Sequence, residues 1–264
     1  MKYYVVDAFT DTVFKGNPAG VCLAENELNS AVMQSIAAEN NLSETAFLVK
    51  KDGYYDLRWF TPKTEIDLCG HATLGSAFLL MNFVDKNAKE IRFETKSGTL
   101  LVTKKDDLYE LDFPSRMPQQ TEITARMERA IGGNILEAHV FGGDLVLVLE
   151  NEQQIQNAIP DFEIIKSVAS HLVTITAKGA SVDFVSRVFA PNAGVAEDPV
   201  TGSAHTVLIP FWAERINKTK MTAMQLSKRS GTLYCEACDG RVKIAGRAVL
   251  YLQGEISING GVLC

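Results

Sequence analysis

The sequence predicts an α+β protein built from two copies of one unit, each with several strands and one apolar helix. The stretch RWFTPKTEIDLCGHATLGSAFLL (58–80) is a strand-like run that breaks at a thiol, a glycine and a histidine and then becomes a helix. A second stretch, RVFAPNAGVAEDPVTGSAH (187–205), matches it at a constant offset (187 − 58 = 129), close to half of the 264 residues. The aligned pairs are Arg58 with Arg187, Phe60 with Phe189, Pro62 with Pro191, and Cys69 with Asp198.

Size and composition predict a globular protein with a core in each half. The chain has 46% apolar and 22% charged residues, and we expect domains at 1–115 and 116–264, with the option that the last strand crosses back to the first. The net charge of −6 and the absence of any Lys and Arg cluster argue against a nucleic-acid partner.

Targeting signals are not apparent in the sequence. The N-terminus lacks the long apolar segment of a signal peptide. The longest run without a charged residue, 68–84, is shorter than a membrane span, so we expect no membrane partner. Five cysteines without a regular framework fit a reducing cytoplasm, which is the expected location.

The first half alternates strand and helix signals. Residues 3–6 read as a strand, and 14–23 read as a turn leading into a second strand, AGVCL. Leu28, Val32 and Ile36 recur every four residues and predict a helix over 29–40. The sequence Asp52-Gly53 predicts a hairpin between the two strands that flank it. A helix over 70–84 is apolar on nearly all faces, so we expect it to be enclosed on every side. A strand meander follows, and 114–118 is the expected linker.

The second half repeats this plan. Strands are expected in ILEAHVFGGDLVLVLE, over 169–176 and over 182–189, and the matching helix over 201–216. Pro210 lies inside that helix and lacks an N–H, so we expect a kink there. The ending LYCEACDGRVKIAGRAVLYLQGEISI predicts more strands, with a hairpin turn at Asp239-Gly240.

Glu44 and His71 are the first two candidates for chemistry. If its strand alternates, Glu44 shares a face with Ala46 and Leu48, which would desolvate the carboxylate and suit it to proton transfer. The alternative is an exposed glutamate at a strand end. His71 lies at a helix start, where unpaired N–H groups favour a substrate carboxylate and the imidazole could donate or carry a proton. It could equally be a capping or core histidine.

Two helix starts carry the remaining candidates. Cys69 lies where a thiol pKa is lowered, although a lone cysteine is also a common small core residue. The loop AEDPVTGSAH gathers acids and hydroxyls, and Thr201-Gly202-Ser203 is a good helix entry whose bare N–H groups a ligand could approach. The plain alternative is a helix cap with an exposed acid. Because the two turns are equivalent in the repeat, we expect them to face one cleft.

Other motifs argue against a metal or cofactor. Cys235 and Cys238 have C-x-x-C spacing but no second pair and no βαβ context. The four histidines show no paired ligand spacing, and neither nucleotide-binding glycine motif occurs. We therefore expect no metal and no nucleotide cofactor.

Four stretches in order resemble the phenazine-biosynthesis-like (PhzF) family. They are VDAFTDTVFKGNPAGVCL, NLSETAF, FTPKTEIDLCGHATLG and EDPVTGSAH, and the ending GRVKIAGRAVLYLQGEI is similar too. The resemblance implies the diaminopimelate-epimerase-like fold, two pseudo-symmetric domains in which a curled, mostly antiparallel sheet surrounds a central helix, with the active site between them. It also implies a cofactor-independent isomerase that is commonly a homodimer.

The resemblance assigns roles residue by residue. Glu44 matches the general acid/base, and His71 and Asp198 match supporting polar residues, giving a catalytic set of three. The expected substrate-binding residues are Asn17, Cys69, Gly70, Thr201, Gly202 and Ser203. The related epimerases use two facing cysteines, whereas this chain has Cys69 on one side and Asp198 on the other, which argues against a two-thiol mechanism.

The sequence hypothesis is an isomerase that moves a proton between carbons of a small carboxylate-bearing metabolite through Glu44. Two alternatives remain open: a binding protein for a small metabolite without chemistry, and an amino-acid epimerase that works through Cys69. The identity of the substrate, and any phenazine role, do not follow from the residues.

Overall fold

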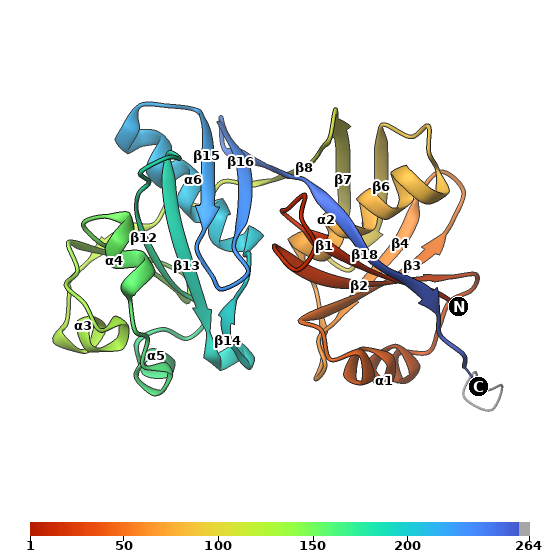
Figure 1. Ribbon diagram of the computed structural model, residues 1–264, viewed down its shortest axis with the longest axis horizontal. Helices are drawn as coiled ribbons and strands as arrows, with labels where there is room; N and C mark the ends of the chain where they lie inside the picture. Colours follow the sequence, from red (N-terminus) through yellow and green to blue (C-terminus); the bar gives the residue numbers. More distant parts are fainter. Residues whose placement is uncertain (259–264) are drawn as a thin grey trace. The chain divides into compact units, whose positions relative to one another are not determined.

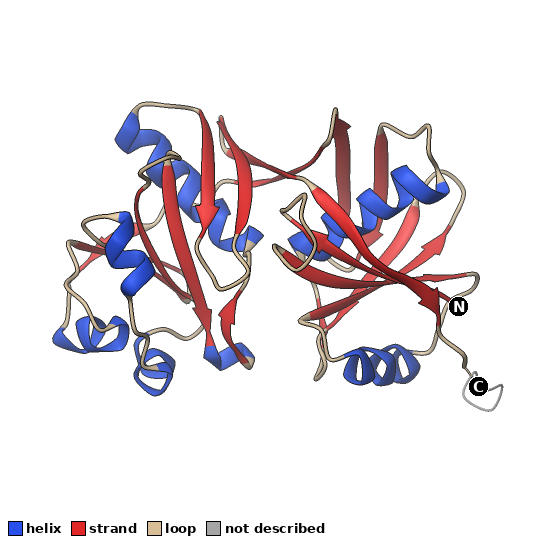
Figure 2. Ribbon diagram, viewed as in Figure 1, coloured by secondary structure: helices blue, strands red, loops and turns tan. Residues whose placement is uncertain are grey.

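The computed structural model describes residues 1–258, which form two compact units. The first unit contains Met1–Asp112 and the chain from Ala245 onward, and the second contains Phe113–Ile244. Each unit combines a mixed sheet with helices (Figures 1 and 2), which confirms the predicted α+β fold of two pseudo-symmetric units. Among the helices of residues 1–258, none has the length and apolar character needed to cross a bilayer.

The first unit alternates antiparallel and parallel strand pairs. Strand β1 pairs antiparallel with β2, β2 parallel with β3, β3 antiparallel with β4, and β4 parallel with β6, which begins an antiparallel meander through β7 and β8. The hairpin and the meander predicted for this half are therefore confirmed. The strands are β1 (Lys2–Ala8), β2 (Asn17–Ala24), β3 (Glu44–Lys50), β4 (Tyr55–Phe60), β5 (Glu65–Ile66), β6 (Glu90–Thr95), β7 (Gly98–Lys105), β8 (Leu108–Pro114) and β18 (Ala248–Glu255).

The second unit repeats the same pairing scheme. Strand β10 pairs antiparallel with β11, β11 parallel with β12, β12 antiparallel with β13, and β13 parallel with β15, which pairs antiparallel with β16. A shared order of parallel and antiparallel pairs is a stronger sign of an internal repeat than three identical residues. The strands are β9 (Gln119–Thr121), β10 (Glu137–Phe141), β11 (Asp144–Val148), β12 (Val173–Lys178), β13 (Phe184–Ala190), β14 (Val195–Asp198), β15 (Lys220–Gln225), β16 (Gly231–Cys238) and β17 (Arg241–Gly246).

The residues that the sequence offset aligned have the same packing in both units. The guanidinium carbon of Arg58 lies 5.2 Å from the centre of the Phe60 ring, and that of Arg187 lies 5.2 Å from the centre of the Phe189 ring. Each arginine also forms a two-pronged pair with a glutamate on the next short strand, Glu65 in β5 or Glu197 in β14. The repeat therefore extends from topology to side-chain contacts.

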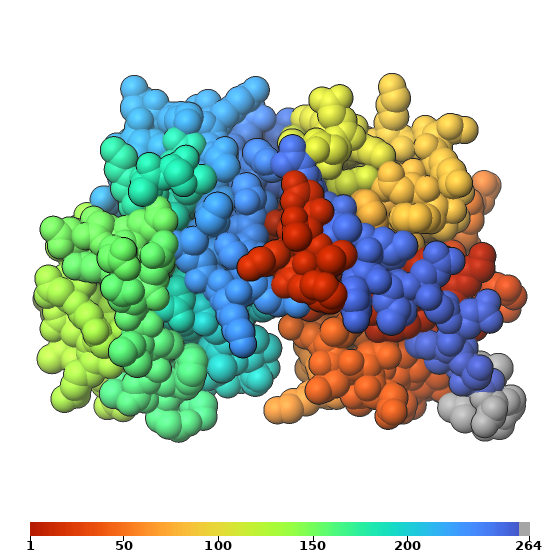
Figure 3. Space-filling model, in the orientation of Figure 1, coloured from red at the N-terminus to blue at the C-terminus, as the bar shows by residue number. Residues whose placement is uncertain are grey.

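One strand returns from the end of the second repeat to the first unit. Strand β18 follows β17 in the chain but pairs antiparallel with β1 of the first unit, whereas β9 lies in the second unit and pairs antiparallel with β10. In Figure 3 the N-terminal segment and the segment of β18 lie side by side on the surface of the first unit. There the ring centres of Phe14 and Tyr251 are 5.4 Å apart.

Helix α2 (Gly70–Leu79) is the centre of the first unit. Eight of its ten residues are buried, and it packs on β1, β2 and β3. Gly75 faces β1, where a Cβ would make an ordinary van der Waals contact with Val6 at 3.4 Å. The helix continues as a π-helical turn, η1 (Leu80–Val84). The helix predicted over 70–84 is confirmed, but its enclosure ends after Met81, since Phe83 is 43% exposed.

Helix α6 (Gly202–Ile216) is its counterpart, and it runs through Pro210 without a break. Proline has no N–H, so the carbonyl of Thr206, four residues earlier, loses its helical donor. The backbone N–H of Arg116 donates to that carbonyl instead, at 3.1 Å. The segment between β8 and β9 thus supplies the hydrogen-bond donor that the proline lacks.

Other helices cover the outer faces of the units. Helix α1 (Ser30–Asn40) is capped by the side chain of Asn29, which confirms the helix predicted over 29–40. The strand predicted over 169–176 is wrong at its start, because β12 begins at Val173 and Ala169 is the C-cap of helix α5. The helices that the sequence reading missed are α3 (Ala125–Ile131), α4 (Glu152–Asn157), α5 (Phe162–Val168) and the 3₁₀ turn η2 (Pro191–Ala193).

Candidate active site

The first unit gathers four of the expected site residues at the starts of three elements. Asn17 begins β2 and Glu44 begins β3, and these two strands are parallel, with Glu44 opposite Ala19. Cys69 is the N-cap of α2 and His71 is in its first turn. Strand β3 does not alternate between exposed and buried residues, because 45–48 are all buried. Glu44 is therefore the first residue of a strand that is enclosed on both faces.

His71 contacts each of the other three residues of this cluster. Its Nε2 lies 3.2 Å from a carboxylate oxygen of Glu44. Its Nδ1 lies 3.3 Å from the side-chain amide nitrogen of Asn17 and 3.6 Å from the sulfur of Cys69. The cluster is sheltered, because the side chain of Glu44 is 16% exposed and that of His71 is 7% exposed. An acid, an imidazole and a thiol are therefore in mutual reach.

The surroundings of His71 define its protonation state. Burial lowers its pKa to about 3, so the imidazole is neutral at neutral pH. The amide nitrogen of Asn17 can only donate, and it faces Nδ1, so Nδ1 accepts and the single proton resides on Nε2. That N–H is on the side of the ring that faces Glu44. The histidine can therefore support the carboxylate with a dipole rather than with a full positive charge.

The start of α2 offers backbone donors beside this cluster. The first N–H groups of a helix have no intrahelical acceptor, and the side chain of Cys69 does not cap them. The first helical bond runs from Thr73 N–H to the Cys69 carbonyl, at 3.1 Å. The amides ahead of it, including Gly70, combine with the helix dipole to favour an anion such as a carboxylate.

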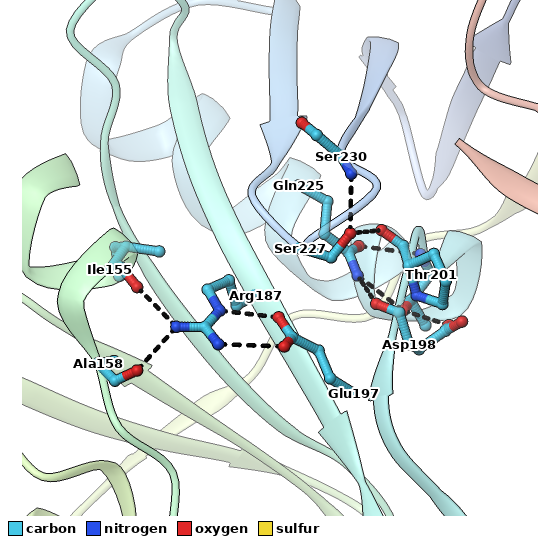
Figure 4. Close-up of polar contacts among 10 residues, drawn as sticks. Ile155, Ala158, Arg187, Glu197, Asp198, Thr201, Gln225, Ser227 and Ser230 are labelled. Carbon is cyan, nitrogen blue, oxygen red and sulfur yellow. Dashed lines mark hydrogen bonds and ion pairs between the residues drawn. The ribbon is translucent and has the colours of Figure 1, made fainter. Parts of the chain in front are cut away.

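In the second unit, Asp198 and Thr201 form a tight turn that a buried glutamine holds in place. The hydroxyl of Thr201 donates to the Asp198 carboxylate. Gln225 is fully buried; its carbonyl oxygen accepts from the Thr201 N–H at 2.9 Å, and its amide donates to the Asp198 carbonyl at 2.7 Å. Figure 4 shows this side chain reaching both residues. Sequence reasoning missed Gln225, and nothing near it in the chain signals its role.

Further contacts fix the strand that leads into this turn. Arg187 binds Glu197 through two nitrogens and also donates to the carbonyls of Ile155 and Ala158 near α4 (Figure 4). The hydroxyl of Ser227 donates to the carbonyl of Pro199 at 2.8 Å. Charge-assisted and two-pronged bonds of this kind restrict the orientation of the groups they join. These bonds therefore fix the position of the backbone on both sides of Asp198.

The start of α6 resembles the start of α2. Thr201 is the N-cap, but its hydroxyl is directed to Asp198 and does not cap the helix. Gly202 is buried and Ser203 is partly exposed in the first turn. His205 is turned away into the core, where Nδ1 donates to the Thr201 carbonyl at 2.8 Å, and burial lowers its pKa to about 4. Asp198, Thr201, Gly202 and Ser203 thus form a second cluster in their own unit.

Potential metal ligands are also brought together. Within residues 1–258, ligand atoms of Glu44, Cys69 and His71 lie within 4.8 Å of one another. The C-x-x-C pair is different: Cys235 and Cys238 are three residues apart on β16, so their side chains project to opposite faces and cannot chelate one ion. Histidine spacing in the sequence could not reveal the first group, because its members come from two separate segments.

Comparison with known proteins places this protein among isomerases. An uncharacterized isomerase of Pseudomonas aeruginosa is 46% identical over 259 residues, which cover 98% of this chain and 99% of that protein. A probable proline racemase from Agrobacterium radiobacter, 10% identical with a TM-score of 0.65 over 98% of this chain and 93% of that one, shares the fold alone.

The family follows from a match over nearly the whole chain. The model of the phenazine biosynthesis-like proteins (PhzC-PhzF) matches residues 6–254. The crystal structure of a PhzF family protein from Enterococcus faecalis superimposes with a TM-score of 0.95 at 50% identity, covering 97% of this chain and 99% of that chain. The protein belongs to the PhzF family, and it is an isomerase.

Proposed function

We propose that the protein moves a proton between carbons of a small carboxylate-bearing metabolite, without an organic cofactor, and that Glu44 is the acid/base. Glu44 would take the proton from one carbon and return it at another. Catalysis of this kind needs a carboxylate that is sheltered from water yet free to exchange a proton.

The contact between His71 and Glu44 is the observation that carries the proposal. A charged imidazolium at 3.2 Å would form a full ion pair and make proton uptake by the carboxylate costly. A neutral imidazole with its proton on Nε2 can instead stabilise the charged carboxylate while leaving it able to accept a proton. His71 is thus proposed as a supporting group and not as the proton carrier.

Substrate binding is proposed at the two equivalent helix starts. The amides of Gly70 and His71 would hold a substrate carboxylate at α2. The turn of Thr201, Gly202 and Ser203, with Asp198, would contribute from the second repeat. Support for this second part comes from the internal repeat, since the start of each central helix lacks a side-chain cap.

The test replaces Glu44 with Gln, which preserves the shape of the side chain and removes the exchangeable proton. Candidate carboxylic acids are incubated with the parent protein in deuterated water, and deuterium uptake at carbon is followed by mass spectrometry. With an accepted acid, Glu44→Gln should lower kcat by about 10²- to 10⁴-fold. Glu39→Gln, on the exposed face of α1, is the matched control. A Glu44→Gln variant that works at the parent rate excludes Glu44 as the acid/base.

An epimerase that uses Cys69 is the second candidate, because its sulfur is 3.6 Å from Nδ1 of His71. It predicts that Cys69→Ser and thiol alkylation both abolish deuterium uptake, whereas the Glu44 mechanism tolerates Cys69→Ser. A protein that only binds its metabolite would bind the acid without any deuterium uptake in the parent.

A further inference from the structure

The site contains a set of ligands that is suited to a transition metal. A thiol, an imidazole and a carboxylate are the three side chains that bind zinc in proteins. Alkaline-earth ions prefer oxygen ligands, so a set with sulfur and nitrogen selects a softer cation. Among the described residues, Glu44, Cys69 and His71 are a group of this kind, with ligand atoms within 4.8 Å of one another.

The distances are close to those of a bound ion. Zinc binds sulfur at about 2.3 Å and nitrogen or oxygen at about 2.0–2.2 Å, so ligand atoms in a tetrahedral site are roughly 3.3–3.8 Å apart. The sulfur of Cys69 is 3.6 Å from one ring nitrogen of His71, and the Glu44 oxygen is 3.2 Å from the other. Small rotations of the three side chains would bring one nitrogen, the sulfur and the oxygen around a single centre.

A second observation is the buried imidazole. His71 is 6% exposed, and its Nε2 makes no hydrogen bond within the described residues although it faces the Glu44 carboxylate. A buried polar atom without a hydrogen bond costs free energy. In the ring tautomer with its proton on Nδ1, Nε2 presents a lone pair, and an ion bound there would remove that cost.

We propose that Glu44, Cys69 and His71 bind one zinc ion, or a divalent transition metal of similar softness, and that the bound ion blocks proton transfer. Binding at Nε2 moves the ring proton of His71 to Nδ1, where the side-chain amide of Asn17 turns so that its oxygen accepts from it. Binding also releases the thiol proton of Cys69 to solvent and leaves a fourth position for water. The ion occupies the lone pairs of the Glu44 carboxylate, so that group can no longer take a proton. The blocking effect rests on the proposed function, whereas the binding does not.

Cobalt(II) provides a direct test, because a cobalt–thiolate bond gives a charge-transfer band in the near ultraviolet. The whole reduced protein, stripped of metal with a chelator, is titrated with Co²⁺ under anaerobic conditions. We expect saturation at one equivalent, a charge-transfer band, and displacement by Zn²⁺ but not by Mg²⁺. Cys69→Ser should abolish the band, and Glu44→Gln and His71→Gln should each weaken Zn²⁺ binding at least 10-fold in competition with a coloured chelator.

Cys238→Ser is the matched control, since this thiol is exposed and belongs to the C-x-x-C pair. It should retain both the band and the stoichiometry, and circular dichroism verifies that every variant is folded. A band that persists in Cys69→Ser, or that is lost in Cys238→Ser, overturns the assignment. If metal binds as expected but Glu44→Gln remains fully active, the proposed function fails and the metal site stands; if Glu44→Gln is inactive and no metal binds, only the metal site fails.

Discussion

The side-chain amide of Asn17 lies 3.3 Å from Nδ1 of His71, and this contact determines which ring nitrogen carries the proton. Because the amide nitrogen is a donor, Nδ1 accepts and Nε2 holds the hydrogen on the side of Glu44. Both residues are buried, so water does not compete for either nitrogen. Asn17, which the sequence predicted only as a substrate-binding residue, thus also sets the tautomer of the His71 imidazole.

The variant Asn17→Asp should reverse this arrangement. A carboxylate accepts from Nδ1, so Nδ1 will be protonated in the variant whether the ring is neutral or charged. The imidazole ¹⁵N chemical shifts of His71 report the change, with Nδ1 moving from the unprotonated to the protonated range. Asn192→Asp, on the surface of the second unit, should leave them unchanged. Protonated Nδ1 in the parent protein would contradict the assignment.

Gln225 should be important for the Asp198 turn although it touches no proposed reacting group. Gln225→Leu removes the partners of the Thr201 N–H and the Asp198 carbonyl. An unsatisfied buried group costs about 1–3 kcal/mol, so the free energy of unfolding in urea should fall by a comparable amount for each. Hydrogen exchange at the Thr201 amide should also be faster.

An exposed glutamine provides the control for this effect. Gln156→Leu, on the surface of α4, makes the same chemical change outside the turn and should alter stability little. Equal losses in the two variants would show that Gln225 does not hold the turn.

The two arginines of the repeat should differ in their contribution to stability. Arg187 is 12% exposed and donates to Glu197 and to two backbone carbonyls, whereas Arg58 is 30% exposed and donates to Glu65 and to a serine hydroxyl. Lysine cannot reproduce the planar, branched donor set. Arg187→Lys should therefore lower the free energy of unfolding by about 1–3 kcal/mol, and Arg58→Lys by at most about 1 kcal/mol. Urea unfolding of both variants measures this, and the reverse order would refute it.

Acid should destabilise the protein through its buried histidines. The pKa of His205 is about 4 in the folded protein, below its ordinary value of 6.5, because burial disfavours the charged ring. Between these values the unfolded chain binds a proton that the folded chain does not, so stability is fully present above pH 6.5 and decreases toward pH 4. The slope from one such group is at most about 1.4 kcal/mol per pH unit. His71 adds to it with the same sign.

His205→Gln should therefore make the loss of stability between pH 6.5 and 4 less steep. His171 is the control, since the Asp144 carboxylate raises its pKa and the stability from this pair is lost as pH rises. His171→Gln should not reduce the acid slope. An unchanged slope in His205→Gln would show that this ring is already protonated in the folded protein.

The sequence predicted the features that depend on local patterns. Three such features are visible in runs of neighbouring residues: the all-apolar run of α2, the four-residue spacing of α1 and the Asp52-Gly53 turn. The short helices α4 and α5, of six and seven residues, do not span enough turns to show a period, so the sequence predicts no element over either of them.

The candidate site was predictable only in part, for a different reason. Motif resemblance singled out Glu44 and His71 separately, but 27 positions of chain separate them, and their 3.2 Å contact depends on how β3 and α2 pack. Gln225 lies 24 positions beyond Thr201 in an ordinary strand. Contacts made by tertiary packing have no local signature in a single sequence.

The return of β18 to the first unit affects the order in which the protein can fold during synthesis. Strand β1 is made before the other described strands, but its partner β18 ends at Glu255, so the sheet of the first unit is completed only after every strand of the second unit has been made. The second unit has all its strands earlier, once Gly246 is made. A truncation that removes only β18 would therefore damage the first unit, and a cut between the two halves of the sequence would separate β1 from one of its partners.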